Sequence, residues 1–201
     1  MPFRPLALGV FIIVLAGCTH LVPDADKIRA IRAVNADFRQ AYEQIIKESG
    51  TAVFNATEAQ AFAAMKACLK TLGMAIETQD SSVGYLRVAA PAPKPLTRQE
   101  WQRAVKTDLP RMRKIVKREI GLMGAFITFE PEGLDIVINV TAVPMPPDSV
   151  ELSVSTRMRE VAPPKSGFPR REYPPPTAMR MAVAKIWSQF DTELTRIKAS
   201  Q

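Results

Sequence analysis

Histidine and cysteine are scarce in this sequence, whose 201 residues include one His and two Cys. Two cysteines are too few for a disulfide scaffold or a thiol-rich zinc module. A single imidazole weakens every catalytic scheme that places histidine beside a nucleophile or a metal. The sequence also lacks a Gly-rich phosphate loop, a G-x-S-x-G elbow, an H-E-x-x-H motif and a calcium-loop pattern. We therefore expect a protein that is not an enzyme and has neither a cofactor nor a metal site.

The sequence contains no apolar run long enough to span a bilayer. The apolar run 6–16 comprises eleven residues, whereas a spanning helix needs roughly 20. Arg4 precedes this run, and the small residue Gly17 follows it. A basic start, a short apolar core and small residues at its end are typical of a secretory signal peptide, here 1–17. The alternatives are an ordinary signal without lipidation or a buried helix that ends in cysteine.

The segment Leu15-Ala16-Gly17-Cys18 resembles the lipobox of bacterial lipoproteins. The resemblance implies that the signal is cleaved before Cys18, that this thiol is diacylated, and that the new amino terminus is acylated. Residues 18–25 would then tether a water-soluble protein to a membrane. Lipoproteins retained in the inner membrane typically carry Asp after the cysteine, and this chain has Thr19. The expected location is therefore the outer membrane, facing the periplasm, with His20 in the tether.

Apolar and charged residues make up 47% and 23% of the chain, a composition typical of globular proteins. The sequence predicts a helix that ends at Gly50, and we divide the mature chain into this N-terminal helix, 26–49, and a domain, 50–201. The helix can fold back onto the domain, or it can pair with a second copy or a partner. Cys68 adjoins the apolar stripe of a later helix, so we expect a buried, inert thiol. The N-terminal helix carries an apolar stripe with one polar member, spaced as in a coiled coil: Ile28, Ile31, Asn35, Phe38, Tyr42 and Ile45.

The remaining pattern predicts an α+β domain in which an antiparallel sheet of about six strands packs on helices in two layers. In element order alone, this outline is similar to the helix-grip domains of the lipoprotein subunit of the outer-membrane β-barrel assembly machine. Thr57 with Gln60, and Thr97 with Glu100, form capping boxes that begin helices. The expected strands are 51–57, 74–78, 85–90, 125–130, 134–142 and 150–159. The expected helices start near 57, 97 and 177, and Pro110 must kink or divide the second, with Thr107 and Asp108 as restart caps.

The excess positive charge is confined to one predicted helical segment. The chain has 27 Lys+Arg and 20 Asp+Glu, and removal of the signal takes away only Arg4. Residues 98–118 hold eight cations against two carboxylates, while the rest of the mature chain is balanced. We predict that this segment binds a partner or an anionic surface through Arg103, Lys106, Arg111, Arg113, Lys114, Lys117 and Arg118.

A basic amphipathic helix attracts phospholipid headgroups, lipopolysaccharide phosphates or an acidic protein. Export would remove nucleic acid as a partner. The alternative is that the segment binds nothing: its basic face is only solvated, and its apolar face covers the sheet. The proline-rich stretch 163–176 also carries Lys165, Arg170 and Arg171, with Phe168 and Tyr173. It is either a stiff connector or a docking surface for a partner.

The sequence therefore predicts a lipid-anchored periplasmic lipoprotein that acts as a non-enzymatic binding or scaffold module in the cell envelope. Its partners would be a membrane, through lipid on Cys18, and an envelope protein or anionic lipid surface, with a possible oligomer through the N-terminal helix. A second hypothesis is a carrier or sensor of an apolar ligand held between the sheet and the C-terminal helix, near Trp187 and Phe190. A third hypothesis is a hydrolase whose catalytic residues lie far apart in the sequence and come together only in the folded protein.

Overall fold

A single antiparallel sheet organises the protein in this computed structural model, which describes residues 24–126, 128–163 and 170–200. Five strands pair in the order β1-β5-β4-β3-β2. The predictions for 1–17, Cys18, His20, Lys165 and Phe168 fall outside the described residues. The strands are β1 (Thr51–Phe54), β2 (Ala75–Asp80), β3 (Tyr85–Pro91), β4 (Leu134–Met145) and β5 (Ser149–Glu160).

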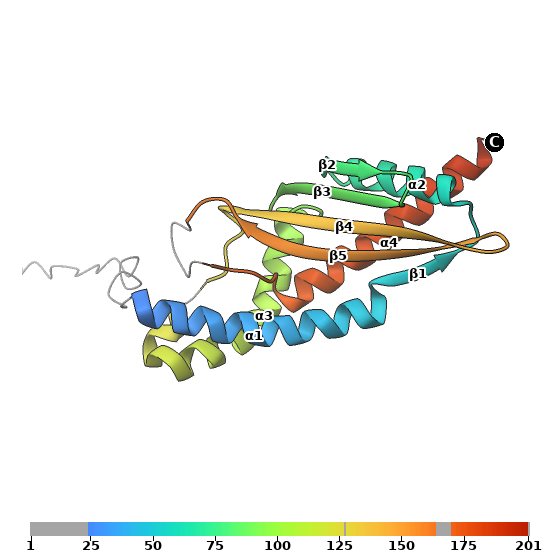
Figure 1. Cartoon of the computed structure of the whole chain (residues 1–201). Coiled ribbons are helices and arrows are strands. Elements are labelled where there is room, and N and C mark those ends of the chain that lie inside the picture. Colours follow the sequence, from blue (N-terminus) through green and yellow to red (C-terminus); the bar gives the residue numbers. More distant parts are fainter. Residues whose placement is uncertain (1–23, 127, 164–169, 201) are drawn as a thin grey trace, which may run out of the picture.

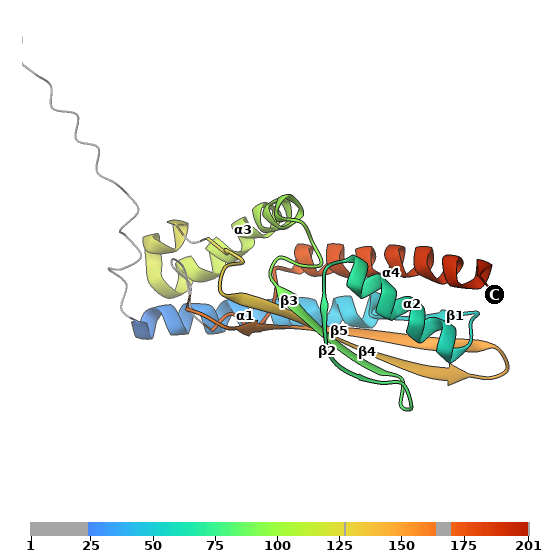
Figure 2. The same ribbon diagram turned by 90° about the horizontal axis from the view of Figure 1, so that it is seen from above.

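Four helices accompany this sheet within the described residues. Helices α2, α3 and α4 lie on one side of it, while α1 runs along the edge formed by β5 and β1 (Figures 1 and 2). Both predicted capping boxes are present, at Thr57 and at Thr97. The helices are α1 (Asp24–Ser49), α2 (Glu58–Thr71), α3 (Arg98–Ile120) and α4 (Pro176–Ala199). The predicted α+β class with an antiparallel sheet is confirmed.

The core lies between the helices and one sheet face. Ile138 pairs with Val88 on one side and Thr156 on the other, so the side chains of all three project to the same face. Ile138 and Val88 are fully buried there. Cys68 of α2 is also fully buried, and its thiol contacts the carbonyl oxygen of Ile186 at 3.4 Å. The opposite sheet face carries mostly polar side chains, including Arg87, Asn139 and Ser155.

Helix α1 packs against its own chain. Its predicted stripe is buried at Ile31, Phe38 and Ile45. Asn35, the polar member, is also buried, and its amide nitrogen donates to the carbonyl of Arg170 at 2.9 Å. Its amide oxygen accepts the Glu172 backbone N–H at 3.2 Å. The stripe is therefore occupied within the chain, and pairing through it with another copy would require α1 to leave the domain.

The prediction of a strand at 125–130 is wrong, and the sheet of the described residues has five strands rather than six. Residues Gly121–Phe126 form a 3-10 helix, η2. A Cβ at Gly124 would lie 2.6 Å from the backbone nitrogen of Lys117, so only glycine lets η2 fold back this closely onto α3. The backbone carbonyl of Phe129 then accepts the indole N–H of Trp101 at 3.4 Å instead of joining a strand.

A candidate interaction surface on helix α3

The first half of α3 is fastened to the core. The Thr97 hydroxyl accepts the Glu100 backbone N–H, and the Glu100 carboxylate accepts the Thr97 backbone N–H. Trp101 and Ala104 are buried on the sheet side. Glu100 also accepts a 2.7 Å hydrogen bond from Lys185 of α4. This bond, together with that from the Thr97 amide, lowers the pKa of Glu100 to about 2.

Helix α3 continues through Pro110 instead of restarting there. Proline lacks the N–H that would extend the hydrogen-bond ladder, and the helix changes direction along its length (Figures 1 and 2). The predicted restart cap, Asp108, instead caps α4. Its two carboxylate oxygens accept the backbone N–H and the hydroxyl of Thr177, each at 2.8 Å. Pro175 and Pro176 provide no side-chain cap at that helix start, so a carboxylate from α3 takes this role.

The second half of α3 runs antiparallel to α1 and is pinned to it at two points. Arg111 forms an ion pair with Asp37 at 2.8 Å. Two turns further on, Glu119 pairs with Arg29 at 3.4 Å. Met112 and Val116 are buried between these two contacts. The last turn of α3 and η2 therefore lie beside the beginning of α1, at the end of the molecule opposite the β4–β5 turn (Figure 1).

This packing leaves a row of free cations on the outer side of α3. Of the seven predicted residues, Arg111 is engaged with Asp37, while the other six have no ion pair with any described carboxylate. All six are exposed, because the buried positions of the helix alternate with them at helical spacing. We call them the free cations of α3: Arg103, Lys106, Arg113, Lys114, Lys117 and Arg118.

Sequence reasoning missed the role of Arg171. Its side chain is 4% exposed, and its guanidinium donates to the carbonyls of Glu130 at 2.5 Å and Glu132 at 3.1 Å. It also lies over the ring of Phe129 and forms an ion pair with Glu160 at 3.6 Å. Burial lowers the pKa of this guanidinium. The described part of the proline-rich stretch thus connects parts of the domain, and no signal in the sequence distinguished Arg171 from its neighbour Arg170.

Exposed apolar side chains lie at both ends of the molecule. Leu122 of η2 is 76% exposed and directly follows the basic half of α3. At the far end of the sheet, Val53 and Val143 flank Glu151 in register, on the face opposite the core. They are 55% and 51% exposed, and Met145 near the β4–β5 turn is 42% exposed. The domain therefore has a basic end that carries the exposed Leu122. At its other end lie Val53, Val143 and Met145, which we call the distal row.

Carboxylates, long helices and one free thiol are also present in the described part of the chain. No group of His, Cys, Asp and Glu side chains there is arranged to hold a metal ion. No helix among the described residues combines the length and hydropathy needed to cross a membrane. Cys68 is fully buried, as expected, and burial raises the pKa of its thiol to about 12. Comparisons with protein-family models, curated proteins and solved structures found no match to this chain.

Proposed function

We propose that this protein is a lipid-anchored lipoprotein of the outer membrane, facing the periplasm, and that it serves the cell envelope as a non-enzymatic binding or scaffold module. The lipid anchor is Cys18, and the binding surface is the row of free cations on α3. The partner is an anionic component of the envelope.

One observation supports this proposal above all: six exposed cations on α3 form no ion pair with any described carboxylate. The helix that carries them is held in place by its contacts with the core and with α1. The carboxylates of α3 itself already have partners. Glu100 forms an ion pair with Lys185, Asp108 accepts hydrogen bonds from Thr177, and Glu119 forms an ion pair with Arg29. Within the described residues, the charged side chains of α3 that face the domain are thus paired, whereas the free cations, which face solvent, are not. Such a surface attracts an anionic partner, and its effect weakens with salt.

The anchor is tested by labelling with a palmitate analogue in Gram-negative cells that express the full chain. We expect Cys18→Ser to abolish incorporation of the label. Persistence of the label in that variant would contradict the assigned anchor site.

The binding surface is tested separately by co-sedimentation with envelope membranes. Residues 19–201 contain the whole described core, which spans Ala30 to Leu194, so this chain can be used without lipid. Replacing Arg103, Lys106, Arg113 and Lys117 with glutamate should abolish sedimentation at low salt. A control variant reverses four exposed cations elsewhere and should sediment like wild type; equal sedimentation of both variants would contradict the proposal. The control substitutions are Lys47→Glu, Lys70→Glu, Arg157→Glu and Arg180→Glu.

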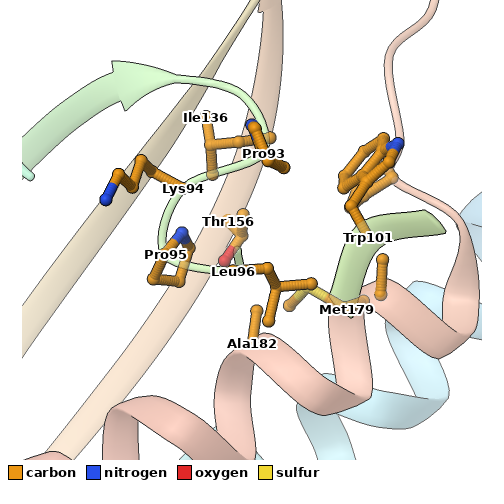
Figure 3. A pocket seen from close by; sticks show the side chains of 11 residues that line it. Pro93, Lys94, Pro95, Leu96, Trp101, Ile136, Thr156, Met179 and Ala182 are labelled. Atoms are coloured by element: carbon orange, nitrogen blue, oxygen red, sulfur yellow. The ribbon is translucent and has the colours of Figure 1, made fainter. Parts of the chain in front are cut away.

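The alternative function is a carrier of an apolar ligand between the sheet and α4, in the manner of a helix-grip domain. At that interface the described residues enclose a cavity of about 10 Å³, lined in part by Ile136, Thr156 and Met179 (Figure 3). This volume accommodates about one water molecule. Further along α4, Phe190 is fully buried against Phe54. Ligand carriage would therefore require α4 to move away from the sheet, and the free cations favour the first proposal.

A further inference from the structure

We infer that the second half of α3, together with η2, docks on a bilayer surface rich in anionic phospholipid and thereby orients the anchored domain. This inference rests on the proposed function and names the partner for one part of the surface. The docking surface comprises Arg113, Lys114, Lys117, Arg118 and Leu122.

The first argument is the place where the chain enters the domain. Helix α1 begins at Asp24, six residues after Cys18. Even a fully extended chain spans at most about 3.6 Å per residue, so the start of α1 lies within roughly 20 Å of the lipid-bearing cysteine. The ion pair between Arg29 and Glu119 holds the end of α3 beside this start. The tether therefore keeps the basic half of α3 within reach of the bilayer, and surface charge acts on it when it approaches to within a Debye length of about 10 Å.

The second argument is charge complementarity at this end of the molecule. The carboxylates at the start of α1 are paired, Asp24 with Lys27 and Asp26 with Arg29. Glu119 shares Arg29. The four cations of the docking surface have no such partner among the described residues. The end of the domain nearest the tether thus presents unpaired positive charge, which suits anionic headgroups.

The third argument is the position of Leu122. A side chain that is 76% exposed directly after a basic helix matches the pattern of peripheral membrane helices, in which cations bind headgroups and an apolar residue inserts among them. An acidic protein could use both the cations and this leucine, and the short distance to the lipid anchor is what favours the bilayer. The β4–β5 turn lies at the opposite end of the domain (Figure 1), and the strand register places the distal row of Val53, Val143 and Met145 near that turn. Docking therefore directs that row away from the bilayer.

The test uses acylated protein purified from membranes and placed in protein-free vesicles of phosphatidylethanolamine and phosphatidylglycerol. A fluorophore is attached at Leu122→Cys or, as the matched distal position, at Met145→Cys; the buried Cys68 does not compete for the label. A nitroxide-bearing lipid reports proximity to the bilayer by quenching. We expect strong quenching at position 122 and weak quenching at 145. Because the tether alone keeps position 122 nearer the bilayer than position 145, the difference should shrink markedly but not vanish in high salt and when phosphatidylcholine replaces phosphatidylglycerol.

Replacing the cations of the docking surface with neutral residues tests whether their charges cause the docking. Each cation near an anionic surface contributes about a fivefold factor in affinity. Changing Arg113, Lys114, Lys117 and Arg118 to glutamine should therefore lower the docking equilibrium constant by about 600-fold. The control variant defined above should leave the quenching at position 122 unchanged.

The outcomes separate this inference from the proposed function. Absence of palmitate labelling or of envelope binding in the wild-type protein would overturn the proposed function. Equal quenching at 122 and 145 in anionic vesicles, with envelope binding intact, would overturn the membrane docking and assign the cations to an acidic protein. Quenching that ignores the headgroup charge would likewise overturn it.

Discussion

Replacing Arg171 with methionine should destabilise the domain far more than an ordinary substitution of arginine. The guanidinium holds two backbone carbonyls, those of Glu130 and Glu132, and lies against Phe129 and Glu160. Phe129 in turn accepts the indole N–H of Trp101, so the same contacts support the start of α3.

The loss of stability can be worked out from the groups that lose their partner when the guanidinium is removed. Hydrogen bonds from a charged donor are each worth about 1.5–3 kcal/mol, and breaking a buried ion pair by removing one partner costs about 3–5 kcal/mol. These contributions overlap, and the methionine regains part of the loss by burying apolar surface. We expect the free energy of unfolding to fall by about 3–5 kcal/mol, which lowers the Tm by about 6–20 °C.

The assay is urea unfolding of residues 19–201, followed by circular dichroism, with thermal unfolding as a second measurement. Arg170→Met is the matched control, because that neighbouring side chain is exposed, and its effect should stay within about 0.5 kcal/mol. Adding Glu160→Gln to the Arg171→Met variant should restore part of the stability, because it removes the carboxylate left without its partner. A loss below about 1 kcal/mol for Arg171→Met would refute the reasoning.

Three further predictions concern single contacts of the same fold. Asp108→Ala removes the cap of α4 and should cost about 1–2 kcal/mol in urea unfolding, with no additional loss when Thr177→Val is added; fully additive losses would contradict the pairing. The lowered pKa of Glu100 contributes stability that is present above the ordinary glutamate pKa and is lost as pH falls toward 2, so Lys185→Met should flatten stability measured from pH 5 to pH 2. An unchanged slope would contradict this. The buried thiol of Cys68, with its pKa raised to about 12, should react with a disulfide reagent at pH 8 only after unfolding, and rapid reaction of the native protein would show that it is accessible.

Local signals in the sequence predicted much of the secondary structure. The Thr57 and Thr97 capping boxes marked the starts of α2 and α3, because such a box satisfies free amides within four consecutive residues. The alternation in β4 and β5 predicted that one face of each strand is buried. The strand expected at 125–130 was wrong because the close approach of Gly124 to Lys117 is a contact between segments that fold back on each other.

The sequence by itself determined that the excess charge is concentrated in 98–118 and that the chain begins with a segment resembling a lipoprotein signal, since both are properties of linear order. Only the tertiary structure decided which cations remain free. Arg111 is engaged because α1 brings Asp37 to it, whereas no described carboxylate reaches Lys114. Likewise, Arg171 and Arg170 are chemically identical neighbours, and the fold buries one of them. Burial and pairing depend on residues that are distant in sequence, so no local pattern can encode them.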